Sequence, residues 1–173
     1  MPRRSQARSR RAKRLSRGER ASRNGGKSRL EVASLYAHAA DFLQAAKSMR
    51  STYRSFRPAR LYLVCHSLEL GLRAFVSLAA GSFDDSRRRA GGHDLGRLLS
   101  KAQSLGLDGL IRFRIKEVTE IRKASLYYAR KVFEYPALAE ALRGYPKRPD
   151  FNALLAVADE LIAAIREPCL GGG

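Results

Sequence analysis

Arg60-Leu-Tyr-Leu-Val-Cys-His-Ser-Leu-Glu-Leu-Gly-Leu-Arg73 is the stretch of sequence that decides the fold. Most of its side chains are apolar, and a helix that is apolar on nearly every side is buried in a protein core. Four polar residues share one helical face, because they are spaced i, i+4, i+7 and i+11: Tyr62, His66, Glu69 and Arg73. Burying a carboxylate or a guanidinium is costly unless it is paired. This polar stripe therefore predicts either an internal network or a functional site.

Helical periodicity extends on both sides of this segment. Apolar residues recur every three or four positions, capping residues precede the runs, and proline or glycine follows them. No segment shows a convincing strand pattern. We predict an all-α fold, an up-and-down bundle of four to five helices with a disordered basic N-terminal tail. The predicted helices span about residues 28–50, 58–80, 94–105, 108–135 and 150–168.

Several helix ends are predicted from single residues. Asp94, Asp108 and Asp150 each precede an apolar run, where an aspartate can cap the first backbone N–H groups of a helix. The pair Tyr135-Pro136 is expected to close the fourth helix, because the residue before a proline is driven out of the helical region.

The second predicted helix also carries a stripe of small residues, Ser67, Gly71 and Ala74. A glycine inside a helix costs about 1 kcal/mol relative to alanine. Close approach of another helix offsets that cost. The neighbour is expected to come either from the same chain or from a second subunit.

The positive charge of the chain is concentrated at its N-terminus. Of the net charge of +18 over 173 residues, residues 1–30 carry +11, with twelve basic groups and one acid. Residues 1–27 have too few apolar side chains to fold, so we predict a disordered tail, a bundle at residues 28–168 and a frayed end at 169–173. A flexible basic tail attracts polyanions in a salt-dependent way, unless it serves only solubility or is an upstream extension of the reading frame. Its densest basic cluster is Arg10, Arg11, Lys13 and Arg14.

The remaining composition favours a cytoplasmic protein without cofactors. Cys65 and Cys169 lack the spacing of a disulfide framework or a metal site, which fits a reducing compartment. No secretory signal and no uninterrupted apolar run of membrane-spanning length is recognisable, so no membrane partner is expected. His66 and Glu69 supply two ligands on one face, fewer than the metal centre of a helical bundle uses, so no metal is expected.

Three segments together resemble the HEPN-like family (higher eukaryotes and prokaryotes nucleotide-binding domain), in a divergent prokaryotic branch. They are the helix from Tyr62 to Phe75, Gly92-His93-Asp94-Leu95, and Tyr127-Tyr128 followed by Glu134-Tyr135-Pro136. The resemblance covers about residues 30 to 167. It implies a helical bundle that often dimerises, so a homodimer is expected. Members occur in toxin–antitoxin and phage-defence settings, and many bind RNA or nucleotides without catalysis.

The catalytic branch of that family uses an arginine and a histidine, four to six residues apart and contributed by two subunits, as a metal-independent ribonuclease site. Arg60 and His66 have this spacing, but Leu61 stands where the catalytic branch usually has a polar residue. At the later position typical of the family, the chain has Arg122 and Tyr127. Tyrosine, with a reference pKa near 10, is a poor general base at neutral pH.

The candidate site residues allow both functional and structural interpretations. His66 and Glu69, with Tyr62 and Arg73 as partners, form either an acid–base or ligand-binding group or an internal network.

The other candidates also allow two interpretations. His93 either flanks the cap Asp94 or, close to His66, binds a phosphate at a helix N-terminus. Arg122 and Tyr127 belong to an aromatic and basic segment that either stacks bases or covers a helix end.

Three functions are therefore kept. The first is a HEPN-like binding module for RNA or a nucleotide in regulation, toxin–antitoxin or defence. The second is a metal-independent ribonuclease in which His66 transfers a proton, Glu69 orients it, and Arg60 or Arg73 stabilises the phosphorane. The third is a non-catalytic partner of a protein encoded by a neighbouring gene.

Overall fold

The computed structural model describes residues 29–49, 58–81, 93–135, 145–146 and 148–171. Every regular element within these ranges is helical, so the predicted all-α bundle is confirmed. The tail cluster Arg10, Arg11, Lys13 and Arg14 lies outside the described residues. The elements are a first helix at residues 29–48, α2 (Pro58–Ala80), α3 (Leu95–Ser104), the 3₁₀-helix η2 (Leu107–Gly109), α4 (Ile115–Tyr128) and α6 (Phe151–Leu170).

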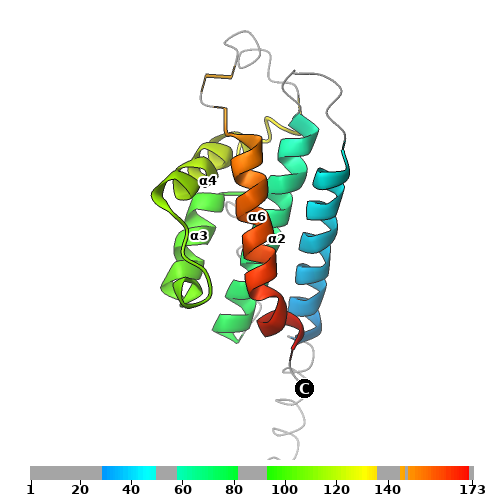
Figure 1. The fold of residues 1–173 in the computed structure, drawn as a ribbon, viewed down its shortest axis with the longest axis vertical. Coiled ribbons are helices and arrows are strands. Elements are labelled where there is room, and N and C mark those ends of the chain that lie inside the picture. The colour runs from blue at the N-terminus through cyan, green and yellow to red at the C-terminus, as the bar shows by residue number, and fades with distance from the viewer. Residues whose placement is uncertain (1–28, 50–57, 82–92, 136–144, 147, 172–173) are drawn as a thin grey trace, which may run out of the picture.

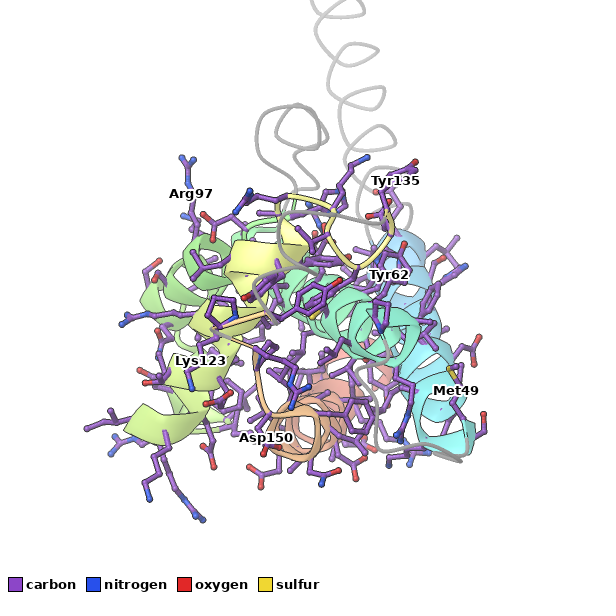
Figure 2. All side chains as sticks on the ribbon, turned by 90° about the horizontal axis from the view of Figure 1, so that it is seen from above. Met49, Tyr62, Arg97, Lys123, Tyr135 and Asp150 are labelled. Atoms are coloured by element: carbon purple, nitrogen blue, oxygen red, sulfur yellow. The ribbon has the colours of Figure 1, made fainter. Side chains whose placement is uncertain are left out.

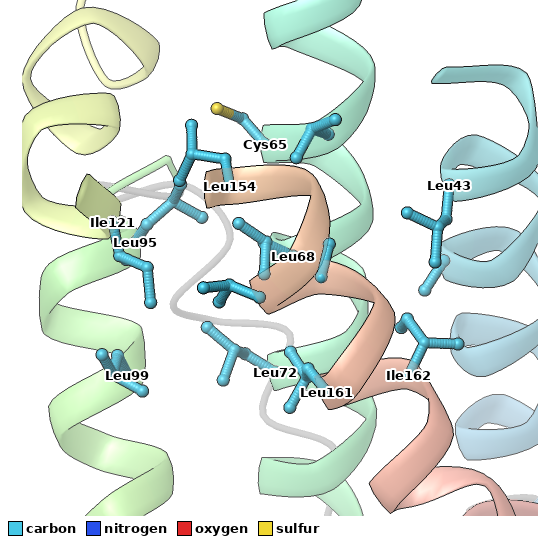
Figure 3. Close-up of a cluster of buried hydrophobic side chains, with 14 of the residues drawn as sticks. Leu43, Cys65, Leu68, Leu72, Leu95, Leu99, Ile121, Leu154, Leu161 and Ile162 are labelled. Atoms are coloured by element: carbon cyan, nitrogen blue, oxygen red, sulfur yellow. The ribbon is translucent and has the colours of Figure 1, made fainter. Parts of the chain in front are cut away.

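Helix α2 lies at the centre of the bundle. The first helix is on one side of it, α3 and α4 are on the other, and α6 packs along it (Figure 1). Leu68 and Leu72 of α2 are almost fully buried and face Leu161 of α6 in the core (Figure 3). This explains why the sequence of α2 is apolar on nearly every side.

The small residues of α2 admit neighbours from the same chain. A Cβ atom at Gly71 would lie 2.8 Å from Cδ1 of Ile162, so α6 occupies the space that a side chain would take. On another side, the Ser67 hydroxyl donates a hydrogen bond of 2.7 Å to the carbonyl oxygen of Ala39 in the first helix. The sequence predicted a neighbouring helix either from the same chain or from a second subunit. In the structure, the neighbours of this stripe are helices of the same chain.

Helices α2 and α6 run in the same direction. The Arg60 guanidinium lies 3.9 Å from the centre of the Phe151 ring near the start of both helices, and Gly71 faces Ile162 further along (Figure 1). The first helix is joined to α6 by an ion pair between Lys47 and Asp159, 2.6 Å apart.

Two of the three aspartate caps are confirmed. Asp94 accepts the backbone N–H of Arg97 at 2.9 Å, and Asp150 accepts that of Ala153 at 2.8 Å. The Asp108 cap is wrong, because Asp108 lies inside η2 and α4 begins later, at Ile115.

The late start of α4 has a local cause. Arg114 precedes the helix, and its backbone N–H donates to the carboxylate of Glu117 at 2.6 Å. Glu117 therefore stabilises the first turn from within the helix, as the acidic residue of a capping box does.

The predicted end of α4 at Tyr135-Pro136 is also wrong. The helix ends at Tyr128, and Lys131 adopts the left-handed conformation with φ of 57°. The backbone N–H groups of Lys131 and Val132 bond back to the carbonyl oxygens of Tyr128 and Tyr127, each at 3.0 Å. This is a left-handed C-terminal cap, with a lysine where glycine is the usual residue.

Helix α6 continues past the predicted end near Pro168. It reaches Leu170, and Cys169 is buried rather than frayed. Pro168 lies inside this last turn, where it has no backbone N–H to donate to the turn before it.

By length and composition alone, α2 could cross a membrane, and it is the one described helix for which this holds. However, 56% of its 18-residue apolar window is buried inside the bundle, and the core helix of a soluble protein passes the same test. The finding is weak evidence for a membrane span.

Candidate functional site

Glu69 is a nearly buried carboxylate in the middle of α2, with 6% of its side chain exposed. Its Oε1 accepts from Nε and Nη2 of Arg73 at 2.9 and 2.8 Å. Its Oε2 accepts the hydroxyl hydrogen of Tyr128 at 2.8 Å. Both oxygens are therefore satisfied, as a buried charge requires.

Two histidines join the same group. Nδ1 of His93 lies 3.0 Å from Oε2 of Glu69. Nδ1 of His66 lies 2.7 Å from the Tyr128 hydroxyl and 3.8 Å from the same Oε2. We call Glu69, Arg73, Tyr128, His66 and His93 the Glu69 network. It connects α2, α4 and the residue that precedes the capped start of α3.

The hydrogen-bond pattern assigns the protons. The single hydroxyl hydrogen of Tyr128 goes to Glu69, so His66 donates from Nδ1 to the phenol oxygen. An ionised carboxylate only accepts, so His93 also donates from Nδ1. In each neutral ring, Nε2 is then the atom with a free lone pair.

The charge of Glu69 is stable over a wide pH range. Burial alone would raise its pKa, but the neighbouring His66 imidazole, the hydrogen bond from Tyr128 and the Arg73 guanidinium lower the pKa from 4.5 to about 2. Burial and the adjacent carboxylate raise the pKa of the Tyr128 hydroxyl far above its ordinary value. The centre of the network is therefore an anion and a neutral phenol at every physiological pH.

The network is sealed at its centre and open at its edge. Glu69 is buried, whereas 23% of the His66 side chain and 35% of the His93 side chain are exposed. The sequence left a choice between an internal network and a site, and the geometry combines both. The buried carboxylate bonds to His93 directly and to His66 through the Tyr128 hydroxyl, and solvent reaches both imidazoles.

Aromatic rings surround His66. Phe42 of the first helix contacts it edge-on at 4.5 Å between ring centres, and Tyr62 lies nearly parallel to it at 5.5 Å. Tyr62 belongs to the same end of the bundle at which Asp150 begins α6 (Figure 2). Burial, with the charges of Glu134 and Glu69, raises the pKa of Tyr62, so its hydroxyl stays protonated.

Asp94 positions His93. Besides capping α3, its Oδ1 accepts the hydroxyl hydrogen of Ser125 on α4 at 3.0 Å. The residue that follows His93 is thereby fixed to the helix that carries Tyr128. The N-cap and the site interpretations of this segment are both consistent with that arrangement.

Three predicted site residues lie apart from this group. Arg60 is six residues from His66, so their side chains leave α2 in directions about 120° apart. Arg60 stacks on Phe151, and its Nε is buried with no partner among the residues that the structure describes. Arg122 is exposed on α4, whereas Tyr127 is buried and stacked on Phe133.

The sequence did not single out Tyr128 and Ser125 as site residues. Tyr128 follows the candidate Tyr127 and is fully buried, and a buried tyrosine hydroxyl needs a hydrogen-bond partner. That need, together with an unpaired buried carboxylate on α2, is the signal that could have joined Tyr128 to Glu69.

The thiols are unsuited to catalysis. Cys65 and Cys169 are both free and buried. Burial, with the charge of Glu69, raises the pKa of Cys65 above the physiological range, and burial raises that of Cys169 to about 11. Within the described ranges, no group of three or more His, Cys, Asp or Glu side chains is arranged to hold a metal ion.

Comparisons with known proteins found no match: no family model, no curated protein and no solved structure resembles this chain significantly.

Proposed function

We propose that this chain is a HEPN-like helical binding module that binds RNA or a nucleotide. In this proposal it acts as a cytoplasmic homodimer in a regulatory, toxin–antitoxin or defence role. The observation that carries the proposal is a pair of partly exposed imidazoles: His93 bonds to buried Glu69, and His66 bonds to the Tyr128 hydroxyl that donates to Glu69.

The chemistry of these rings suits a nucleotide. Protonated imidazole nitrogens donate to phosphate oxygens, as charge-assisted hydrogen bonds do. Half-buried Tyr62 lies parallel to His66, and aromatic side chains of this kind stack on bases. One site thus offers donors for the phosphate and a ring surface for the base.

The basic tail adds attraction without sequence preference. Residues 1–30 carry a net charge of +11, which strengthens association with any polyanion and makes it depend on salt. The tail and the Glu69 network therefore make separable contributions in this proposal.

Binding of a random-sequence single-stranded RNA pool to the full chain tests the proposal. We expect His66→Ala to weaken binding at physiological salt, whereas His38→Ala leaves it unchanged. His38 is a matched control because its exposed side chain bonds to the Ser34 carbonyl oxygen, away from the network.

The two contributions are separated by a salt series. We compare wild type with a variant in which glutamine replaces Arg10, Arg11, Lys13 and Arg14. RNA binding by this variant is expected to depend less on salt concentration than binding by wild type. Absence of any affinity for the RNA pool and for free nucleotides would contradict the proposal.

A ribonuclease that pairs Arg60 with His66 has less support, because the two side chains leave α2 in different directions and Arg60 lies over Phe151.

A protein contact on α4 has one observation in its favour. Ile115 and Leu126 are 87% and 55% exposed, and eleven residues of helix place them on one face. Light scattering after size exclusion measures the expected dimer directly.

A further inference from the structure

We infer that the chain contacts an anionic lipid membrane through residues 110–116, where two exposed apolar side chains stand among three basic ones. These residues connect α3 to the first turn of α4, on the opposite side of the bundle from the first helix (Figure 1). The inference goes beyond the proposed function and does not depend on it. The sequence predicted no membrane partner because it shows no spanning segment, and a surface contact does not need one.

Five side chains of this segment face solvent. Ile115 is 87% exposed, the largest fraction among the large hydrophobic side chains that the structure describes, and Leu110 is 46% exposed. Arg112, Arg114 and Lys116 are exposed beside them, and no acidic residue lies between. We call these five residues the 110–116 surface. One exposed apolar side chain is ordinary, whereas two among clustered basic groups indicate a contact with a partner.

The bundle core holds this segment in shape. Ile111 and Phe113 alternate with the exposed residues and are partly buried against the core. The backbone N–H groups of Leu110 and Ile111 donate to the carbonyl oxygen of Leu107 at 2.9 and 3.0 Å. Leu107 itself is fully buried. The 110–116 surface therefore exists before any partner arrives.

The acidic side chains nearest in sequence are engaged within the chain. The carboxylate of Glu117 accepts the backbone N–H of Arg114 at 2.6 Å and lies 3.8 Å from its guanidinium Nε. The Arg114 side chain is nevertheless 85% exposed. Asp108 accepts from the side chain of Gln103 at 3.3 Å. The surface is therefore positive and complements an anionic partner.

Charge and size favour a bilayer over the other partners. A second copy on the same surface would bring like charges together, which is costly. RNA attracts the basic groups, but Ile115 and Leu110 have no ring to stack on a base. A specific protein interface takes about 20–30 residues a side, far more than this segment offers. At a membrane, apolar side chains enter the acyl boundary while lysine and arginine stay among the headgroups.

The basic tail supplies a second attraction. A small apolar element alone holds a protein on a membrane weakly, and a polybasic segment strengthens the attachment. Residues 1–30 carry a net charge of +11, and basic residues close to an anionic leaflet are attracted to it. The tail and the 110–116 surface together therefore meet the requirement for two signals.

A fluorescence experiment tests the contact directly, because the chain contains no tryptophan. The full chain with Ile115→Trp is mixed with vesicles of equal parts phosphatidylcholine and phosphatidylserine. We expect its emission to shift to shorter wavelength and to be quenched by lipids brominated on the acyl chains. Vesicles of phosphatidylcholine alone are expected to cause no change.

Leu170→Trp is the matched control, because Leu170 is 52% exposed and ends α6. The first helix, which follows the tail, begins at the end of the bundle where α6 ends, and α4 lies nearer the opposite end (Figure 1). Adsorption through the tail alone therefore brings the end with Leu170 to the vesicle. We expect the emission of Leu170→Trp to stay unchanged.

Vesicle sedimentation measures the strength of the contact. Ile115→Ser is expected to weaken binding to the mixed vesicles by about tenfold or more, because one apolar side chain no longer leaves water. Leu170→Ser should bind as wild type does. Glutamine at Arg112, Arg114 and Lys116 together is expected to weaken binding and to reduce its dependence on salt.

Contrary results identify the other occupants. Wild type that does not sediment with the mixed vesicles overturns the inference. Unshifted emission of Ile115→Trp on vesicles that sediment the protein also overturns it, and assigns adsorption to the tail. An equal shift with polyglutamate or with the RNA pool assigns the surface to that polyanion. A dimer lost in Ile115→Ser, with vesicle binding unchanged, assigns it to a second copy. None of these results alters RNA binding by the Glu69 network.

Discussion

The hydroxyl of Tyr128 donates to Oε2 of Glu69 at 2.8 Å, across 59 positions of sequence. The same hydroxyl lies 2.7 Å from Nδ1 of His66. One phenol therefore satisfies a buried charge and orients a neighbouring ring, so α4 is docked on α2 by a polar contact inside an apolar core.

Replacing Tyr128 with phenylalanine keeps the ring and removes the hydroxyl. We expect a loss of about 1–3 kcal/mol in the free energy of unfolding, because a buried carboxylate loses a donor. That corresponds to about 2–4 °C in melting temperature for each kcal/mol. Calorimetry checks it, with Tyr135→Phe as control because 64% of Tyr135 is exposed. Equal effects of the two changes would contradict the role of the contact.

Acid is expected to destabilise the fold through Glu69. Its folded-state pKa is lowered from 4.5 to about 2. The resulting stability is fully present above pH 4.5 and is lost as the pH falls towards 2. The shift corresponds to on the order of 3 kcal/mol. Urea unfolding at a series of pH values measures this loss.

Glu69→Gln is the variant that identifies the source of this acid sensitivity. The neutral side chain is expected to remove that share of the pH dependence and to lower stability at neutral pH. The exposed residue Glu160, changed to glutamine, serves as the control. If both variants keep the acid dependence of wild type, another group causes it.

Lys131→Gly is expected to stabilise the chain by up to about 1 kcal/mol. The φ of 57° at Lys131 is unfavourable for a residue with a side chain and free of strain for glycine. Lys131→Ala removes the same charge and keeps the strain, so it isolates the backbone effect in chemical denaturation. A glycine variant no more stable than the alanine variant would disprove the explanation.

Gly71→Val is expected to cost about 1–3 kcal/mol, the range for an overpacked core. The new Cβ would lie 2.8 Å from Cδ1 of Ile162, and two further methyl groups would push α6 away. Gly71→Ala should cost much less, because the end of the Ile162 side chain can move. Ala79→Val, at an exposed position of the same helix, controls for β-branching. Thermal unfolding distinguishes the three variants.

Local pattern predicted much of this molecule. The shared face of the polar stripe and the caps Asp94 and Asp150 depend on residues a few positions apart, and the structure agrees. Asp108 failed as a cap because Glu117 stabilises a later start of α4 from inside the helix. Propensity alone does not decide between two such acidic residues.

The partners of the stripe could not be predicted in the same way. Tyr128 and His93 reach Glu69 from 59 and 24 positions away, and such distances depend on how the helices pack. The left-handed conformation of Lys131 could not be predicted from the sequence for a related reason. Lysine has no preference for this conformation, and the residues that follow it, Val132 and Phe133, are buried.

The separation between Glu69 and Tyr128 also affects synthesis of the chain. At 5–20 residues per second, the ribosome needs roughly 3–12 s to make the 59 residues between them. During that interval the carboxylate of Glu69 lacks the tyrosine hydroxyl that donates to it, which opposes burial of α2. The apolar surface of α2 therefore leaves the ribosome well before α4, which supplies that hydroxyl, has been made.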